Sequence, residues 1–366
     1  MEHIIPFSRL RQVVRLGMPN PTTHLTELVL HMDASRVSII CTVRDEADNI
    51  AALLDSMLAQ TRPADEIVIN DCGSRDTTPA IIARYIAAGH RIRLIYGGHN
   101  IPSGRNNAIA HAAYPIIACT DAGLTLDPRW LEWIVAPIER NTADLVGGFF
   151  QPAPHSLFEL VLGATNYREP HEIDPATFLP FGKSVAFRKA AWARAGGYPE
   201  WASHCEDILF DLALRRNGAR LAFVPAALVL FRPRGSLRAF ARQYFQYARG
   251  DGVANLWPRR YAIRYVIYSA AAALLLGARR RPWLLALTLP GGLAYTRAPL
   301  RRLRARAPAL SAGELLAAAA LIPLIRLVGD LAKMLGYPIG VWRRWRSAEL
   351  RSAIKNYRRG KTSNFD

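Results

Sequence analysis

Short apolar runs alternate with segments of helical spacing over most of the first 250 residues, and this alternation limits the fold more than any other feature. Residues 37–43 (VSIICTV) are continuously apolar and β-branched, a pattern typical of strands buried on both faces. Residues 48–60 (DNIAALLDSMLAQ) follow with the apolar spacing of an amphipathic helix. The alternation predicts an α/β fold with a mostly parallel sheet flanked by helices. We expect further strands at 66–70, 91–96, 115–120, 145–150, 184–188, 221–224 and 227–231, and further helices at 76–88, 103–113, 128–139, 158–167, 190–195, 205–217 and 237–249.

In such a sheet, ligands bind beyond the carboxyl ends of the strands. The sequence puts polar side chains there: Thr42, Arg44 and Glu46 end or follow the first strand, Asp71 the second and Asp121 the fourth. Solvated loops explain one or two such positions but explain three strand ends poorly. We therefore expect a ligand site at this edge of the sheet.

The basic charge of the chain is concentrated in its last third. Residues 1–257 hold 26 Lys/Arg and 25 Asp/Glu, whereas residues 258–366 hold 21 and 4. The arginines flank the apolar stretches 265–277, 282–295 and 314–329. Basic side chains beside apolar segments fit an anionic membrane surface better than a nucleic acid. We expect a membrane-associated C-terminal region and no nucleic-acid partner; a soluble helical appendage is the alternative.

The apolar stretches of this region are short for membrane spans, which need about 20 residues. Arg279–Arg281 separate the first two stretches, and the third carries Arg326 and Asp330. If all three crossed, basic clusters would lie on both sides, against the positive-inside tendency. We expect a re-entrant hairpin or interfacial helices, with a true span as the alternative.

The N-terminus and the cysteines indicate a cytoplasmic protein. Residues 1–16 alternate apolar and basic side chains without an apolar core, so we expect no signal peptide there but a basic interfacial helix or a lead-in without fixed structure. Met32 makes an internal start an alternative. The four cysteines form no Cys-x-x-Cys pair and have no metal-ligand spacing, as in a reduced compartment.

Five motifs together resemble the family 2 glycosyltransferases, which have the GT-A fold. They are VSIICTVRDEADNIAALLDSMLAQTRPADEIVINDCGSRDTTPAI, GRNNAIAHA, TDAGLTLDPRWL at the position of the family's Asp-x-Asp motif, CEDILFDLALRR and QYARG. They occur in the family's order over about 37–250. The resemblance implies a domain at 36–250, with a nucleotide-binding half at 36–123 and an acceptor half at 124–250. Residues 1–35 would then be a lead-in, and 251–366 the membrane-associated helical region with its basic tail.

On the donor side, the resemblance implies that Thr42, Arg44 and Glu46 line the nucleoside pocket. Asp71 would accept a hydrogen bond from the base, and a carboxylate there favours a base with an N–H such as uracil. Arg105 would lie near the pyrophosphate or the sugar. The expected donor is therefore a nucleotide sugar, with UDP-sugar as the first candidate.

At the reacting centre, the resemblance implies that Asp121 faces the diphosphate through Mg²⁺ or Mn²⁺. Asp207 would be the general base on the acceptor hydroxyl, supported by Glu206. Gln246 and Arg249 would steady the leaving diphosphate or the acceptor. The implied reaction is an inverting sugar transfer to a hydroxyl of a lipid-linked or glycan acceptor at the cytoplasmic face of the membrane, to which the C-terminal region anchors the protein.

Two departures and several alternatives accompany this resemblance. Gly123 stands where the family has a second Asp, and Gly250 replaces the Trp of the Gln-x-x-Arg-Trp motif, so we expect a single-sugar transferase. Asp207 could instead be an N-terminal helix acid, and Gln246 and Arg249 a solvated face. A nucleotidyltransferase is one alternative function, although residues 41–49 (CTVRDEADN) lack its glycine-rich loop. A catalytically inactive sugar-nucleotide-binding membrane scaffold is another.

Overall fold

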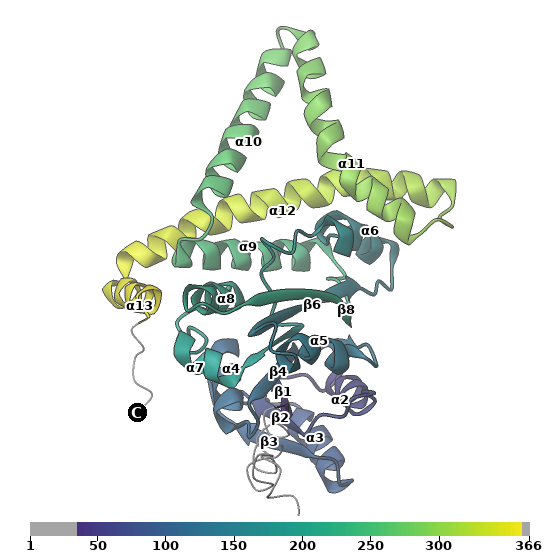
Figure 1. Ribbon diagram of the computed structural model, residues 1–366. Helices are drawn as coiled ribbons and strands as arrows, with labels where there is room; N and C mark the ends of the chain where they lie inside the picture. The colour runs from purple at the N-terminus through teal and green to yellow at the C-terminus, as the bar shows by residue number, and fades with distance from the viewer. Residues whose placement is uncertain (1–34, 361–366) are drawn as a thin grey trace, which may run out of the picture.

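The computed structural model describes residues 35–360 and is built around one eight-stranded mixed sheet (Figure 1). Its strand order is β3-β2-β1-β4-β7-β6-β8-β5, and β3, β2, β1 and β4 are mutually parallel. This confirms the predicted α/β class with flanking helices. The expectations for the N-terminus fall on residues 1–34, outside the described part. The strands are β1 Val37–Val43, β2 Glu66–Asp71, β3 Ile92–Tyr96, β4 Ile116–Asp121, β5 Leu124–Leu126, β6 Leu145–Pro152, β7 Val185–Arg188 and β8 Leu221–Phe231.

The continuous apolar character of β1 follows from burial on both faces of the sheet. Val37, Ile39 and Cys41 belong to one buried cluster, whereas Ile40 belongs to a second cluster with Ile109 on the other face. Successive strand side chains point to opposite faces, so a strand covered on both sides has no polar alternation. The helices over the first face are α2 Ile50–Leu58, α3 Thr78–Ala87 and α5 Trp130–Glu139, and those over the second are α4 Ile101–His111, α7 Lys189–Ala195 and α8 Glu206–Arg216.

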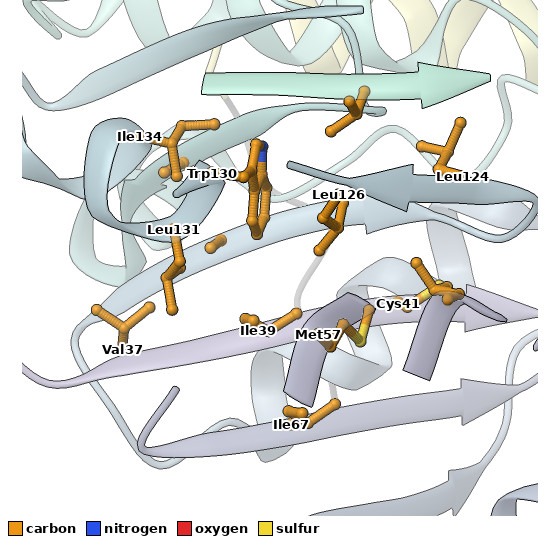
Figure 2. Close-up of a cluster of buried hydrophobic side chains, with 14 of the residues drawn as sticks. Val37, Ile39, Cys41, Met57, Ile67, Leu124, Leu126, Trp130, Leu131 and Ile134 are labelled. Atoms are coloured by element: carbon orange, nitrogen blue, oxygen red, sulfur yellow. The ribbon is translucent and has the colours of Figure 1, made fainter. Parts of the chain in front are cut away.

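Figure 2 shows how the first cluster fills the space between sheet and helices. Met57 of α2 and Trp130 of α5 pack over Ile39 of β1, and all three are at most 1% exposed. The Trp130 indole N–H donates a hydrogen bond to Ser184 Oγ at 2.8 Å, which satisfies its buried polar atom. Full burial of side chains of this size stabilises the fold by about 1.5–3 kcal/mol each.

The second half of the sheet is irregular. β7 is antiparallel to both β4 and β6, and β8 pairs parallel with β6 with a register shift between Gly147 and Phe149. The two expected strands at 221–224 and 227–231 are therefore two paired stretches of one strand. Pro225 lies between them, and proline cannot donate a ladder hydrogen bond.

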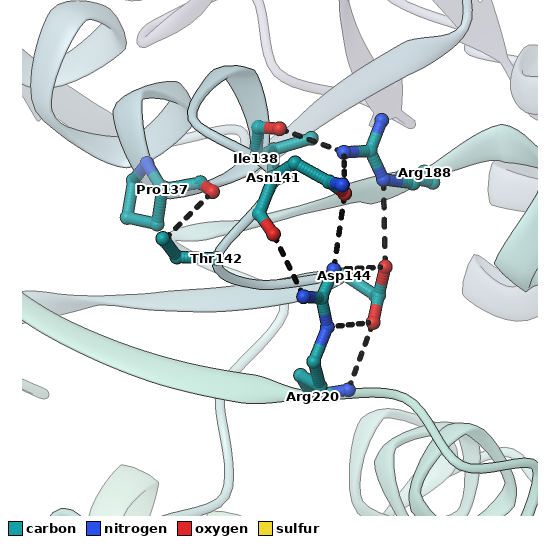
Figure 3. A network of polar contacts seen from close by, with 7 residues as sticks. All are labelled: Pro137, Ile138, Asn141, Thr142, Asp144, Arg188 and Arg220. Carbon is teal, nitrogen blue, oxygen red and sulfur yellow. Dashed lines mark hydrogen bonds and ion pairs between the residues drawn. The ribbon is translucent and has the colours of Figure 1, made fainter.

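At the end of the sheet opposite to the predicted ligand edge, one carboxylate joins three strands (Figure 3). Asp144, just before β6, accepts hydrogen bonds from Arg220 Nε at 3.0 Å and from its backbone N–H at 3.0 Å. Arg188 of β7 lies 3.4 Å away and also donates to the Ile138 carbonyl at the end of α5. The hydrogen bond with Arg220 lowers the pKa of Asp144 to about 2.

Helix α9 (Leu237–Ala254) joins the sheet domain to the C-terminal region by packing along α12 (Ala312–Arg346) (Figure 1). The two backbones approach so closely that only glycine fits. A Cβ added at Gly340 would lie 2.0 Å from the Arg249 carbonyl oxygen, and one at Gly252 would lie 2.2 Å from that of Tyr337. Small residues permit such close helix packing, also in membranes.

Helices α10 (Pro258–Ala278), η4 (Pro282–Thr288) and α11 (Leu289–Arg306) form a hairpin that projects away from the sheet (Figure 1). In the described part of the chain, α10 and α12 are long and apolar enough to cross a membrane, by length and composition. The 21 residues of α10 extend the expected stretch 265–277 to about 31 Å, close to the thickness of a hydrocarbon core. The apolar stretch 265–277 by itself is too short to cross a membrane, but the helix that contains it is long enough.

Candidate active site

The parallel register brings the predicted strand-end residues to one edge. Thr42 lies opposite both Asn70 and Asp121 on the neighbouring strands, and Val43 lies opposite Asp71. Thr42, Asp71 and Asp121 therefore share one edge of the sheet, as the sequence predicted.

Two polar atoms at this edge remain available to a ligand. Asp71 Oδ1 accepts hydrogen bonds from the backbone N–H and the hydroxyl of Ser74, both at 2.8 Å, while its Oδ2 has no hydrogen-bond partner among residues 35–360. Thr42 Oγ1 is buried and likewise unpartnered within the described residues. Buried polar atoms normally have partners, so this pair is suited to a bound molecule.

Arg44 and Glu46 lie in the loop after β1, which is tied to the loop after β2. The backbone N–H of Asp45 donates to Ser74 Oγ at 2.9 Å, and that of Ala47 donates to Asp76 Oδ2 at 3.0 Å. Arg44 is half exposed, and Glu46 accepts a hydrogen bond from the Asn49 amide. Both predicted nucleoside residues therefore stand on the rim of the site, on a loop held in a defined position.

Arg105 connects the two halves of the domain. Its Nη2 donates to Asp121 Oδ1 at 2.6 Å and its Nη1 to Glu206 Oε1 at 3.0 Å, and the side chain is only 3% exposed. A Cβ at Gly182 would lie 2.3 Å from the guanidinium, so glycine at that position leaves room for it. The sequence predicted Arg105 near the pyrophosphate or the sugar; the guanidinium lies buried between two carboxylates.

Glu206 and Asp207 open α8, and the residue before them, Cys205, has a left-handed backbone with φ of 64°. Burial raises the pKa of both carboxyl groups, and the proximity of Asp207 raises that of Glu206 further. Arg105 opposes the rise in both cases. Asp207 is only partly buried, which leaves it accessible to a second substrate.

Lys183, just before β7, is a residue of the site that the sequence analysis missed. Its Nζ lies 4.5 Å from the ring centre of Phe231 and 5.3 Å from that of Phe150. Burial lowers the pKa of Lys183, and Asp121 and Asp207 are the charges that oppose this fall. The described residues give its ammonium group neither a hydrogen bond nor an ion pair. A lysine just before a buried strand was the available signal, and it is a weak one.

The described side chains fit a divalent cation only if a bound substrate supplies further ligands. Among residues 35–360 no three His, Cys, Asp or Glu side chains are grouped as a metal site. Asp121 uses Oδ1 for Arg105, while its Oδ2 has no hydrogen-bond partner among residues 35–360. Mg²⁺ is commonly held by one or two carboxylates plus substrate phosphates and water, so one free carboxylate oxygen is a sufficient protein contribution.

The two predicted residues of α9 lie differently. Gln246 has a buried Oε1 without a hydrogen-bond partner in the described part. Arg249 forms no ion pair with Asp121 or Asp207; it lines a pocket with His204 and Arg343. The structure thus groups Arg249 with the end of α12 and not with the cluster around Arg105.

Comparisons with known proteins agree with this geometry. The model of glycosyl transferase family 2 matches residues 38–192, from β1 into α7. The succinoglycan biosynthesis protein ExoA of Rhizobium meliloti is 27% identical over 252 residues, which cover 66% of this chain and 76% of that protein. The glycosyltransferase AglE of Haloferax volcanii is 32% identical over 116 residues, which cover 31% of this chain and 38% of that protein.

Among solved structures, a mannosyltransferase from Pyrobaculum calidifontis in complex with GDP-Man and Mn²⁺ is similar at 21% identity and a TM-score of 0.49, with 85% of this chain and 87% of that chain covered.

The match to the family model lies on the α/β domain whose strand ends carry the polar site. The chain carries a family 2 glycosyltransferase domain at residues 38–192. Glu206, Asp207, Gln246 and Arg249 lie beyond the matched residues, so their roles rest on their own geometry.

Proposed function

We propose that the protein transfers a single sugar, with inversion, from a nucleotide diphosphate donor to a hydroxyl of a lipid-linked or glycan acceptor. The observation that carries this proposal is the Arg105 bridge, which brings Asp121 from the donor edge to Glu206 and thereby to Asp207. An inverting transfer needs a leaving-group site and one base, and this cluster offers both.

The donor would bind at the ends of β1 and β2. The free Oδ2 of Asp71 can accept a hydrogen bond from an N–H on the edge of a base, and the hydroxyl of Thr42 can pair with the nucleoside. Uracil presents such an N–H, so we propose a UDP-sugar as donor. Arg44 and Glu46 on the rim would enclose the nucleoside.

Asp121 would hold the diphosphate end of the donor. A divalent cation, Mg²⁺ or Mn²⁺, would neutralise the charge that develops on the leaving diphosphate. Oδ2 of Asp121 is the protein atom available to it, and Arg105 fixes the orientation of that carboxylate. Lys183 lies near Asp121, and its ammonium group has no partner within the described part of the chain, so it is suited to a phosphate oxygen of the same group.

Asp207 would remove the proton from the acceptor hydroxyl. Burial raises the pKa of Asp207, which makes it a stronger base than an exposed aspartate. Glu206, held by Arg105, would fix the start of α8 and hence the position of Asp207.

The protein would work at the cytoplasmic face of a membrane, on an anionic surface. The exposed apolar side chains of the hairpin and the basic residues around it support this location. We propose that residues 36–250 form the catalytic domain and that residues 251–366 anchor it to the membrane.

The experiment that tests the proposal is Asp207→Asn in the full chain. The amide keeps the oxygen that accepts from the Ile208 N–H at 2.8 Å but cannot accept a proton. We expect sugar transfer to fall by about 10²–10⁴-fold while the affinity for UDP is unchanged. Transfer is measured by UDP release with a panel of nucleotide sugars, and affinity by calorimetry.

Glu132→Gln is the matched control, because Glu132 is likewise an acid in the first turn of a helix but lies on the surface of α5. It should turn over like the parent. Near-parental transfer by Asp207→Asn would exclude Asp207 as the base.

A further inference from the structure

A second polar pocket lies where residues 201–204 meet the C-terminal ends of α9 and α12. The pocket is shallow and open to solvent, and water-sized groups can occupy about 30 Å³ of it. The polar side chains that line it are Ser203, His204, Arg249 and Arg343. Figure 1 shows the end of α12 and α13 (Ala348–Arg358) beside α8 and α9 at this corner of the molecule.

The two arginines of this pocket have no counter-charge in the described part of the chain. Neither guanidinium forms an ion pair or a hydrogen bond there, whereas Arg264 pairs with Asp330 and Arg344 donates to the Gly252 carbonyl. Burial, and then the charge of Arg343, lower the pKa of Arg249. Burial and the charge of Arg249 lower that of His204. Two adjacent guanidinium groups repel each other unless an anion lies between them.

The neighbouring side chains indicate that this anion belongs to an amphiphile. Arg343 lies on α12 between Trp342 and Trp345, which are 56% and 71% exposed. Exposed tryptophans beside arginine are typical of the headgroup level of a membrane, where the group that guanidinium recognises best is phosphate. Five residues after Val253 of the same pocket, α10 begins at Pro258, and this helix has exposed apolar side chains.

The pocket lies close in the chain to Asp207, the proposed base. His204 precedes Asp207 by three residues, so their Cα atoms are at most about 11 Å apart. The pocket therefore adjoins the segment that leads into α8, the helix that carries Asp207.

We propose that Arg249 and Arg343 bind the phosphate group of a lipid-linked acceptor. The inference rests on the proposed function, because only a transferase has an acceptor. The phosphate site itself is independent of the donor site. Ser203 and His204 add a hydroxyl and a ring N–H as donors.

The test uses the full chain in nanodiscs of zwitterionic lipid, with farnesyl phosphate as probe and farnesol and inorganic phosphate as comparisons. We expect farnesyl phosphate to bind at least tenfold more tightly than either comparison. Arg343→Gln should weaken the binding of farnesyl phosphate about tenfold, and Arg343→Lys should restore part of it. Because Arg343 is exposed and makes no hydrogen bond in the described structure, its loss should not unfold the protein.

Arg346→Gln is the matched control, since Arg346 is one turn further along α12, outside the pocket and stacked on Trp342. It should bind farnesyl phosphate like the parent. Equal binding of farnesol and farnesyl phosphate, parental binding by Arg343→Gln, or complete competition by phosphatidylglycerol in the nanodisc would each overturn the inference. The last result would make the pocket a site for ordinary lipid headgroups.

UDP affinity in the presence of Mn²⁺ is measured on the same samples. Arg343→Gln should leave it unchanged. Failure of the parent to bind UDP would count against the proposed donor, whereas loss of UDP affinity in Arg343→Gln alone would overturn the separation of the two sites.

Discussion

Arg105 shows how one residue can define a site that no single motif describes. Its charge is almost completely buried, and desolvation of such a charge is costly unless it is paired. Asp121 and Glu206 supply the pairing from positions 16 and 101 residues away. Removing both carboxylates would leave the buried charge of Arg105 uncompensated, and removing Arg105 would leave the buried Glu206 without its counter-charge, so the three side chains hold one another in place.

The structure also explains why position 123 is a glycine and not a second metal-ligating acid. It has a φ of 73° in the turn between β4 and β5. An aspartate is strained in that left-handed conformation, whereas glycine is not. The tight turn into β5 thus favours glycine and leaves Asp121 as the carboxylate at this strand end.

At the residue scale we predict that Asp121→Asn removes the effect of the cation on donor binding. The amide oxygen can still accept from Arg105, but the charge that attracts a divalent cation is lost. Addition of Mn²⁺ should raise the affinity of the parent for UDP at least tenfold, and that of the variant by less than twofold, measured by calorimetry with and without EDTA. Asp55→Asn, on the outer surface of α2, is the control. Equal stimulation in Asp121→Asn and the parent would remove Asp121 from the cation site.

At the scale of elements, α12 is held to α9 mainly by close backbone contact. The glycines at 329, 336 and 340 face α9 along one side of α12. Ion pairs from Arg302 and Arg306 of α11 to Glu172 and Glu169 add a second attachment. The proposed anchor therefore packs rigidly against the domain that carries the site.

Asp144 predicts a stability that depends on pH. Its folded pKa of about 2 lies below the ordinary value of 3.8, so its contribution is fully present above about pH 4 and is lost as the pH falls through 2. Asp144→Asn should lower the free energy of unfolding by about 2 kcal/mol at pH 7, because each pKa unit corresponds to about 1.4 kcal/mol. The difference in thermal unfolding between variant and parent should be smaller at pH 2.5 than at pH 7 and should vanish below pH 2. Asp174→Asn, an exposed loop carboxylate, should unfold like the parent at both pH values. A difference that is the same at pH 7 and pH 2.5 would contradict the assignment.

At the scale of the whole molecule, the hairpin of α10, η4 and α11 should hold the protein on membranes. Val266 and Leu276 are 68% and 60% exposed on α10. An aspartate in a lipid-facing helix costs about 2.5–3.5 kcal/mol at the bilayer centre, so the double change Val266→Asp and Leu276→Asp should move most of the protein to the soluble fraction after cell lysis. UDP binding should be retained, since neither side chain contacts the catalytic domain.

The control for that experiment is Ile86→Asp on α3, an exposed apolar residue far along the chain from the hairpin. It should stay with the membranes. Sedimentation of the double variant with the membranes, as for the parent, would contradict the anchor.

The sequence by itself determined the fold class and the edge of the sheet that carries the candidate site. These follow from local patterns: apolar runs and helical spacing fix the elements, and residues at strand ends meet because neighbouring parallel strands end together. Thr42, Asp71 and Asp121 could be predicted for that reason. The irregular β8 could not, because its bulge at Pro225 depends on pairing with β6.

Only the tertiary structure decided how the charged residues are grouped. Arg105 joins Asp121 to Glu206, Lys183 lies between aromatic rings near Asp121 and Asp207, and Arg249 lies beside Arg343. Each grouping unites segments that are far apart in the chain, and side-chain periodicity carries no information about such distances. The packing of α8, α9 and α12 on the sheet supplies that information.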